Sequence, residues 1–515
     1  VISYTYGATS KDLERIAING INAASAITYH PFGGVKRMTL GNTRVWSNSL
    51  DQDGRVKTYT LNAVTYTIAW DAANRITGIT SSQTATNRTF GYDNLDRITS
   101  FSTTGRSQNF SYDATGNLTA KTDINSGTPT NYTFTIAPTS NRMTGISNLG
   151  IGYSFDAAGN RTGDGKITYA YNYRGRLNQV RIINGAVTNI YDYLINGVNL
   201  RVRKTGPTTV VPQGMQIFVY DDAAKLIGEY DDLGRARVEH VWLEDRPIAV
   251  ITYTYTGTST TPTTTTTSYV ETDHLATPRL ITNASRQKRW TWESAPYGDT
   301  FPNENPQALG AYKYNLRFPG QYFDAETNHH YNHHRDYEST TGRYVQSDPI
   351  GLAGGFNTYL YVDGNPLSFS DFLGLMASIP GCSSRILDSW EKTINKTTTE
   401  VLWSSDLPWA HFGSPKLGGE TPDPRGGRKQ KPPVKADVFE IWMTLHQIQR
   451  VRELQATEIY QRIQAWCRRT EMDECGNTRE RIDYGNPVDS LLDSTGWIEI
   501  DSRINYIVRK RFRIW

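Results

Sequence analysis

Two phrases in the second half of the sequence place the same residue types at the same spacing. Asp-Pro-Ile-Gly-Leu (348–352) and Asp-Phe-Leu-Gly-Leu (371–375) begin with aspartates that lie 23 positions apart. Two carboxyl groups held close together cannot both ionise easily, so one of them keeps a proton. The ionised group can then activate water while the protonated group supplies an acid, which is the chemistry of an aspartic protease. A single Asp-Pro-x-Gly phrase would predict only a turn, so two unrelated turns are the alternative.

Four histidines lie just before these phrases, at His329, His330, His333 and His334. The i, i+4 spacings within the group would suit a metal site if the segment were a helix. The surrounding sequence favours a strand instead, and neighbouring residues of a strand face opposite sides. We therefore expect structural histidines and no metal site.

The C-terminal part of the chain offers weaker candidates for chemistry. His411, His446, Glu453 and Arg450 are the residues there that could serve as acid, base or charge-stabilising groups. His446 and Glu453 are seven positions apart and would share one face of a helix, but ion pairs on a helix surface explain this pattern better. The last segment, 503–515, interleaves basic and aromatic residues, which would suit nucleic-acid binding. An exposed edge strand protected by charge is the alternative for that segment.

The composition of the chain predicts a large β-rich protein. It has 515 residues with 31 tyrosines and 43 glycines, and its net charge is +3. Tyrosine suits strands and glycine suits tight turns, whereas a nearly balanced charge argues against a nucleic-acid partner for the whole chain. The three cysteines are too few for a disulfide framework, which predicts synthesis in a reducing cytosol. No uninterrupted apolar run approaches about 18 residues, so we expect no membrane span.

One phrase recurs along the first half of the chain: an aromatic residue and Asp, then two or three small residues, Gly or Asn, and a basic or polar residue before an aliphatic one. Its copies are WDAANRITGIT (from Trp70), YDNLDRITSF (Tyr92), YDATGNLTAK (Tyr112), FDAAGNRTG (Phe155), YNYRGRLNQV (Tyr171), YDDAAKLIGEY (Tyr220) and YDDLGRARVEHVW (Tyr230). Each copy predicts a β-hairpin in which Asp caps the turn and Gly takes the position with positive φ. The recurrence at similar offsets predicts a repeat architecture.

The pattern changes after Leu375. No tyrosine-aspartate phrase follows, and residues 417–436 form a polar, Pro- and Gly-rich linker. In residues 437–469 apolar side chains recur at spacings of three, four and seven, which predicts an amphipathic helix. Residues 376–515 are therefore expected to form a separate, small domain of mixed α and β structure.

The tyrosine-aspartate phrases resemble those of RHS/YD-repeat proteins, whose repeats coil into a spiral β-sheet that closes as a hollow shell. The stretches YVETDHLATPRLITN (269–283) and LRFPGQYFDAETNHHYNHHRDYESTTGRYVQSDPIGL (316–352) resemble the core that ends such shells. The resemblance implies a mainly β fold: a wall over 1–315, a core over 316–375 and a C-terminal toxin domain over 376–515. Shells of this family are usually longer, so we expect that part of the wall is missing from this sequence.

The resemblance also implies a self-cleaving protease. Asp348 and Asp371 would form the catalytic pair, and the cut would fall between Leu375 and Met376. The supporting motif residues would be Pro349, Gly351, Leu352 and Gly374. Phe372 departs from the family, which usually has Pro there. Arg343 matches a basic position of the family motif, so we expect a charge-assisted bond from Arg343 to one aspartate, with a salt bridge at a strand end as the alternative.

The function implied by the resemblance is that of a secreted antibacterial effector. Its shell would enclose its own C-terminal domain as cargo and release it by self-cleavage, and the implied partners are a cognate immunity protein and the spike or adaptor proteins of a type VI or related secretion system. No cofactor is implied. The protein would be made in the bacterial cytoplasm and delivered into a target cell. A nuclease is the favoured toxin activity, with nucleic acid as its target. The alternative is a cell-surface adhesion shell with a non-toxic C-terminal interaction domain.

Overall fold

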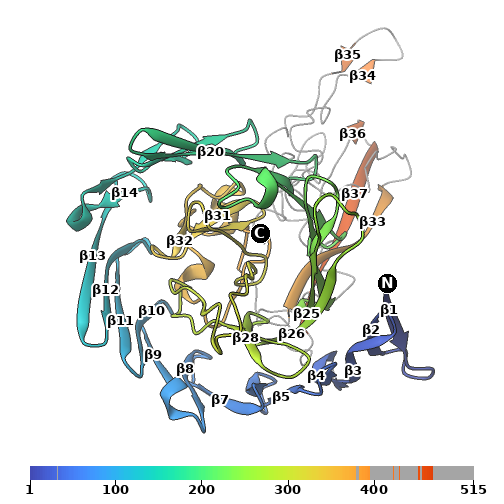
Figure 1. Ribbon diagram of the computed structural model, residues 1–515. Coiled ribbons are helices and arrows are strands. Elements are labelled where there is room, and N and C mark those ends of the chain that lie inside the picture. The colour runs from blue at the N-terminus through green and yellow to red at the C-terminus, as the bar shows by residue number, and fades with distance from the viewer. Residues whose placement is uncertain are drawn as a thin grey trace.

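The computed structural model describes residues 1–31 and 33–377, together with the backbone of five later stretches, 382–394, 421–422, 428–429, 451–452 and 455–467. Within these residues the protein is built almost wholly from antiparallel strands, as the sequence predicts. Two large curved sheets surround a small central sheet (Figure 1). No helix in the described part of the chain has the length and apolar character needed to span a membrane.

The first large sheet has 15 strands within the described residues, and each strand pairs with the next one in sequence. Its strands are β1 (Ile2–Tyr6), β2 (Leu13–Ile18), β3 (Ile21–His30), β4 (Gly33–Leu40), β5 (Val45–Leu50), β6 (Val56–Leu61), β7 (Val64–Trp70), β8 (Ile76–Ser81), β9 (Arg88–Tyr92), β10 (Ile98–Thr103), β11 (Arg106–Tyr112), β12 (Leu118–Asn125), β13 (Thr128–Ile136), β14 (Met143–Ile146) and β15 (Ile151–Gly152). Short 3₁₀ turns, η1 (Thr84–Thr86) and η2 (Ser147–Leu149), interrupt the connections.

The second large sheet continues the same up-and-down order with 13 strands in the described part of the chain. Its strands are β16 (Ser154–Phe155), β17 (Arg161–Gly163), β18 (Ile167–Tyr171), β19 (Leu177–Asn184), β20 (Val187–Ile195), β21 (Arg201–Thr205), β22 (Met215–Tyr220), β23 (Leu226–Tyr230), β24 (Ala236–Leu243), β25 (Arg246–Thr254), β26 (Thr264–Thr272), β27 (Pro278–Thr282) and β28 (Lys288–Thr291). The 3₁₀ turn η3 (Pro212–Gly214) precedes β22.

The tyrosine-aspartate phrases form the turns between neighbouring strands, which confirms the predicted hairpins. After β9, Asp93 Oδ1 accepts hydrogen bonds from the backbone N–H of Leu95 and Arg97 at 2.9 and 3.1 Å, and Oδ2 accepts one from Arg97 Nε at 2.7 Å. The same cap on the amide four residues ahead recurs at Asp71, Asp113, Asp156 and Asp231. Where Gly occupies the turn, as at Gly116 and Gly159, its φ is 85° and 90°, a backbone conformation that favours glycine.

A central four-stranded sheet lies within the curve of the two large sheets (Figure 1). Its strands are β29 (Tyr322–Asp324), β30 (His329–Asn332), β31 (Arg335–Glu338) and β32 (Arg343–Tyr344), and the 3₁₀ turns η4 (Gly351–Gly354) and η5 (Val362–Gly364) follow. A core of aromatic side chains, including the fully buried Tyr337, Tyr344 and Tyr361, packs this sheet against the second large sheet.

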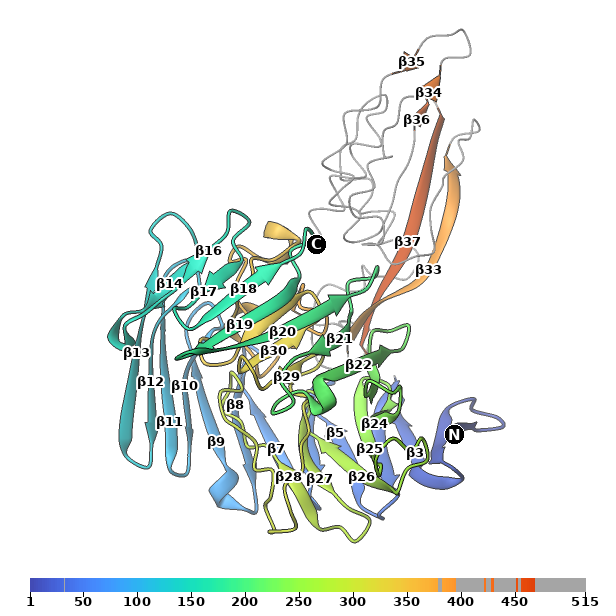
Figure 2. The same ribbon diagram turned by 45° about the horizontal axis from the view of Figure 1, so that its top comes forward.

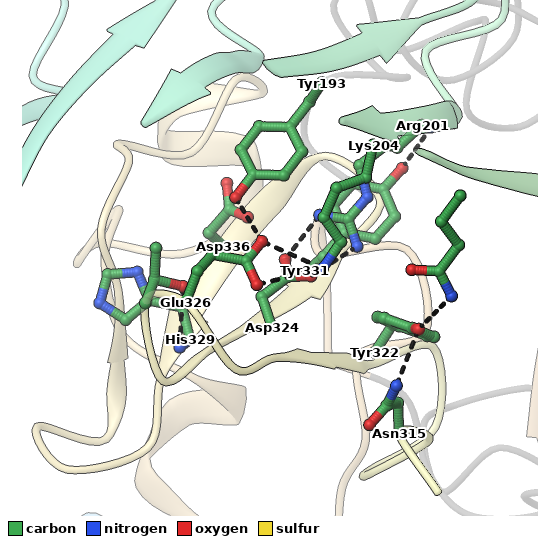
Figure 3. Close-up of polar contacts among 12 residues, drawn as sticks. Tyr193, Arg201, Lys204, Asn315, Tyr322, Asp324, Glu326, His329, Tyr331 and Asp336 are labelled. Atoms are coloured by element: carbon green, nitrogen blue, oxygen red, sulfur yellow. Dashed lines mark hydrogen bonds and ion pairs between the residues drawn. The ribbon is translucent and has the colours of Figure 1, made fainter. Parts of the chain in front are cut away.

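Buried ion pairs also dock the central sheet onto the wall (Figure 3). Arg201 on β21 donates two hydrogen bonds to the Asp324 carboxylate at 2.5 and 3.0 Å. Lys204, also on β21, contacts Asp324 at 2.8 Å and Glu326 at 3.0 Å, and Glu326 accepts the Tyr193 hydroxyl at 2.7 Å. Every charge of this group is therefore paired, as buried charges require.

The two large sheets meet along a seam between β3–β6 and β25–β27. Trp46 Nε1 on β5 donates to the Thr272 carbonyl on β26 at 2.9 Å, and the Asn42 side chain donates to Thr282 Oγ1 at 2.9 Å. The backbone N–H of Asn62 donates to Glu271 Oε2 at 2.6 Å. A hydrophobic cluster drawn from both sheets fills the space behind these bonds.

Beyond residue 377 the structure describes strands only: β33 (Cys382–Ile394), β34 (Thr421–Pro422), β35 (Arg428–Lys429), β36 (Val451–Arg452) and β37 (Gln455–Cys467). The helix predicted for 437–469 is therefore wrong over β36 and β37, and its other residues lie outside the described ones. A spacing of four between apolar residues fits one face of a strand as well as a helix, and β37 pairs with β33 from Ala456 to Cys467. These two strands extend beyond the rim of the curved sheets (Figure 2).

Candidate self-cleavage site

The fold brings the two predicted aspartates to opposite sides of one arginine. Asp348 follows β32, and Asp371 lies in the last described loop before residue 377. Both are buried, at 6% and 2% exposure. Arg335 on β31 contacts Asp348 Oδ2 through one terminal nitrogen at 2.8 Å and Asp371 Oδ2 through the other at 3.3 Å. A buried guanidinium with its two terminal nitrogens on two carboxyl groups holds both of them in one site.

Arg335 also holds the chain next to the predicted cut. Its Nε donates to the Gly374 carbonyl at 2.6 Å, and its guanidinium carbon lies 3.7 Å from the centre of the Tyr344 ring. Sequence reasoning missed this residue. The signal that could have found it is an arginine directly after the four histidines of the predicted strand, thirteen positions before the first aspartate.

The second phrase reuses the turn chemistry of the repeats. Asp371 Oδ1 accepts the backbone N–H of Leu375, four residues ahead, at 2.9 Å, as the repeat aspartates do. It also accepts the N–H of Met376 at 3.2 Å. The carboxylate that caps the turn therefore lies at the nitrogen of the Leu375–Met376 peptide bond, even though Phe372 replaces the expected proline.

The first phrase approaches the same peptide bond from its carbonyl side. Asp348 Oδ1 accepts the N–H of Ile350 at 2.9 Å, which leaves Oδ2 facing Arg335 and Gly354. A Cβ atom placed on Gly354 would collide with Asp348 Oδ2 and would lie 2.8 Å from the Leu375 carbonyl oxygen. The carboxyl group of Asp348 and the carbonyl of Leu375 thus converge on Gly354, a residue that sequence reasoning missed.

Burial sets the protonation of the pair. It raises the pKa of Asp348 to about 7, because the shielding from water outweighs the opposing charge of Arg335, and Asp371 adds to the rise. Burial also raises the pKa of Asp371, against the opposing effects of Arg335, the Tyr344 hydroxyl and the two backbone N–H groups. At neutral pH the site therefore suits one protonated and one ionised carboxyl group.

The expected bond from Arg343 to an aspartate is wrong. Arg343 donates to the Asn141 carbonyl of the wall and stacks 4.9 Å from the centre of the Tyr359 ring. The reason is the alternation of side chains along β32. Tyr344 reaches Asp371 at 2.7 Å, so its neighbour Arg343 points to the other face.

The remaining motif residues, Pro349, Gly351, Leu352 and Gly374, have no polar side-chain atoms and so cannot bond to the peptide bond through a side chain. Pro349 is half-buried, whereas Leu352 is 72% exposed. Gly351 and Gly374 have φ values of 58° and 69°, which glycine adopts without strain. The Phe372 ring lies 5.3 Å from that of His333.

The four histidines are buried among protein side chains. His329 lies 3.5 Å from Glu338 Oε1, His330 Nδ1 lies 2.7 Å from Gln321 Oε1, and His334 Nδ1 lies 2.5 Å from an Arg176 nitrogen. Burial lowers the pKa of His333 to about 3. Among the described residues no three His, Cys, Asp or Glu side chains gather as a metal site would require.

The toxin candidates lie outside the part of the chain whose side chains are described. These are His411, His446, Arg450 and Glu453, together with the basic and aromatic end at 503–515.

A comparison of this sequence with known protein families agrees with the repeats and turns described above. Residues 52–358 match the Teneurin YD-shell family, and this match covers more than half of the chain. The chain belongs to the Teneurin YD-shell family. The expected RHS/YD-repeat shell is thereby confirmed. Asp348 lies inside the matched residues of the YD shell, and Asp371 lies beyond them.

Several curated relatives of this YD shell carry the names of toxins or nucleases. Probable deoxyribonuclease RhsA of Dickeya dadantii is 25% identical over 361 residues, which make up 65% of this chain and 24% of that protein. Toxin protein Tse5 of Pseudomonas aeruginosa is 27% identical over 28% of this chain and 13% of its own. Double-stranded DNA deaminase toxin A of Burkholderia cenocepacia is 34% identical over 21% of this chain and 8% of its own. The matches thus span a minor part of each of these relatives.

Solved structures share the fold of the YD shell. The crystal structure of TcdB2-TccC3-Cdc42 aligns with a TM-score of 0.61 at 20% identity, over 73% of this chain and 20% of that one. The Tc holotoxin pore of Photorhabdus luminescens aligns with the same TM-score, identity and coverage.

Proposed function

We propose that this YD-shell protein cuts its own chain between Leu375 and Met376 and thereby releases a C-terminal toxin. One observation carries the proposal: Asp371 lies 3.2 Å from the nitrogen of that peptide bond, while Asp348 approaches its carbonyl beside Gly354. An acid at the carbonyl oxygen and a base near the nitrogen are what the hydrolysis of an amide needs.

The proposed reaction follows from the protonation of the pair. Asp371 takes a proton from a water molecule as the water oxygen bonds to the Leu375 carbonyl carbon, and Asp348 gives its proton to the carbonyl oxygen. When the intermediate collapses, the C–N bond breaks, Asp371 passes its proton to the Met376 nitrogen, and Asp348 recovers its own. The products are a carboxyl group on Leu375 and an amine on Met376. Arg335 offsets the negative charge of the pair throughout.

The released part would act as the toxin. The names of the relatives support an enzyme that acts on DNA, and a nuclease is the favoured activity. A toxin of this kind needs a cognate immunity protein in the cell that makes it, secretion-system spike or adaptor proteins as partners, and a route from the producing cytoplasm into a target cell. Enclosure of the C-terminal domain by the shell would protect the producer before delivery.

The test is the intact mass of the purified protein beside Asp348→Asn and Asp371→Asn. Asparagine keeps an acceptor oxygen for the backbone amides, so both variants keep the turn while losing the acid–base pair. We expect a wild-type species that ends at Leu375, another that begins at Met376, and two variants that stay whole.

Asp71→Asn is the matched control. Asp71 caps a turn of the wall by accepting the backbone N–H of Arg75 at 2.9 Å, and Asn172 accepts the equivalent bond from Arg176 at its own turn, so asparagine can keep the cap. The substitution removes a carboxyl group of the same kind from a turn outside the candidate site. This variant should be cut like the wild type. A wild type that remains one chain of 515 residues would contradict self-cleavage and favour a shell that keeps its C-terminal domain.

A further inference from the structure

The Tyr344 hydroxyl lies between two groups that fix the direction of its proton. Its oxygen receives a hydrogen bond from Asn332 Nδ2 at 2.8 Å and lies 2.7 Å from Asp371 Oδ2. The same Asn332 nitrogen donates to the Asp371 carbonyl at 2.8 Å. A carbonyl oxygen only accepts, so the Asn332 side chain must present its NH₂ group here. The Tyr344 proton therefore has to point at Asp371.

With the Tyr344 proton oriented in this way, hydrogen-bond donors surround the Asp371 carboxylate. Oδ1 accepts two backbone N–H groups, and Oδ2 accepts the Tyr344 hydroxyl and an Arg335 nitrogen. A carboxylate offers about four acceptor positions, and a proton on any of them would face a donor. Asp348, by contrast, accepts one backbone N–H and one Arg335 nitrogen.

The charge of Arg335 alone would not keep Asp371 ionised and Asp348 protonated. It lies closer to Asp348, at 2.8 Å, than to Asp371, at 3.3 Å, so its charge favours ionisation of Asp348. In the described part of the chain, the other ionisable groups near the pair are Tyr361 and Asp363, which face Asp371, and Arg176, which acts on Asp348. His334 also lies here, bonded to Arg176, and burial lowers its pKa well below the usual value. Arg176 likewise favours ionisation of Asp348.

We propose that Tyr344, oriented by Asn332, is the positioning residue that assigns the single proton of the pair to Asp348 and keeps Asp371 ionised. This assignment rests on the proposed self-cleavage and deepens it, because it decides which aspartate acts as base and which as acid. Tyr344 touches neither the peptide bond nor water in this role. It acts through Asp371.

The experiment is the pH profile of self-cleavage in Tyr344→Phe. The full chain is synthesised in a cell-free system buffered across the pH range, and the fraction cut is followed over time. Phenylalanine keeps the ring beneath Arg335 and removes one donor from the ionised Asp371, so the pKa of Asp371 should rise. The acidic limb is the part of the profile where the rate of cleavage rises with pH as Asp371 loses its proton. Its midpoint should move up by roughly one pH unit, so that cleavage at a given pH on this limb is about tenfold slower.

Tyr337→Phe is the matched control. Tyr337 is fully buried in the same aromatic core, but its hydroxyl donates to the Tyr297 carbonyl at 2.8 Å and not to an aspartate. Its loss should lower stability to a similar extent without moving the acidic limb.

Asn332→Ala is a second test variant, measured by the same pH profile, in case Tyr344→Phe folds poorly. It leaves the hydroxyl in place but frees its rotation, so the acidic limb should move in the same direction by a smaller amount. Acidic limbs of Tyr344→Phe and Asn332→Ala that coincide with that of the wild type would overturn the assignment while leaving self-cleavage intact. A wild type that is not cut at any pH would overturn the proposed function, and the assignment with it.

Discussion

At the scale of single residues, Gly354 has no room for a side chain beside the two groups of the candidate site that it touches. Its φ does not lie in the left-handed region, so alanine at this position would suffer no backbone strain. The added methyl group would instead collide with the Asp348 carboxyl group and crowd the Leu375 carbonyl. Displacement of reacting groups by about 1 Å can slow a reaction about 100-fold. We expect Gly354→Ala to slow self-cleavage by about that factor, measured as the fraction of intact chain after synthesis.

The control is Gly152→Ala, because Gly152 also has ordinary backbone geometry and has nothing within 4 Å of an added Cβ. This variant should be cut at the wild-type rate. Equal cleavage of Gly354→Ala and wild type would contradict the placement of the Leu375 carbonyl beside Asp348.

The pKa of Asp348 predicts how self-cleavage depends on alkaline pH. Burial raises this pKa well above the usual value of an aspartate, to about 7, so Asp348 is protonated below neutrality and ionised above it. The proposed acid is therefore lost as the pH rises through about 7, and the rate of cleavage should fall by up to tenfold for each further unit. A time course of cleavage between pH 5 and pH 9 measures this limb. A rate that keeps rising above pH 7 would contradict Asp348 as the acid.

At the scale of elements, the sequence predicted what local chemistry determines. The Asp cap and the positive-φ glycine act within one turn, so the hairpins at Asp93 or Asp113 could be predicted from a few neighbouring letters. Arg335 could not, because its partners Asp348 and Asp371 are brought to it only by the folding of the central sheet. For the same reason Arg343 was misplaced: only the register of β32 shows which of two adjacent residues faces the aspartates.

The docking of β29 onto β21 predicts a large loss of stability from a single change. Arg201→Met would leave the buried Asp324 with one cationic partner among the described residues, Lys204 (Figure 3). Breaking one side of a buried ion pair typically costs about 3–5 kcal/mol. Because Lys204 remains beside Asp324, we expect a loss at the lower end of this range, about 3 kcal/mol. Thermal or urea unfolding of the cleaved and uncleaved protein measures it.

The companion variant is Arg201→Met combined with Asp324→Asn. Removing both charges leaves no uncompensated ion, so the double variant should be less destabilised than the sum of the two single variants. Additive losses would mean that Arg201 and Asp324 contribute independently of each other.

At the scale of the whole molecule, the seam between the large sheets decides whether the strands form a closed curve or an open ribbon. Trp46 and Thr272, or Asn42 and Thr282, are more than 200 positions apart in the chain. No local pattern in the sequence marks them as partners, so the repeat could be predicted but its closure could not. The same holds for Arg161, which reaches across 177 positions to pair with Glu338 of the central sheet.

Trp46→Ala should open this seam. Trp46 is fully buried, donates across the seam to Thr272, and carries the Arg246 guanidinium 3.8 Å above its ring. Its loss leaves a large cavity between two sheets, for which a cost of about 3–5 kcal/mol is typical. We expect a lower unfolding temperature together with a larger radius of gyration in X-ray scattering, and faster proteolysis of the strands β1–β5.

Trp70→Ala separates opening of the seam from a simple loss of stability. Trp70 makes the same kinds of contact, a bond from Nε1 to the Val56 carbonyl at 3.0 Å and an Arg55 guanidinium 5.4 Å from its ring, but all within the first sheet. It should lower the unfolding temperature without enlarging the molecule. If both variants stay as compact as the wild type, the curve must be held by the central sheet, and the seam would then be a consequence of closure and not its cause.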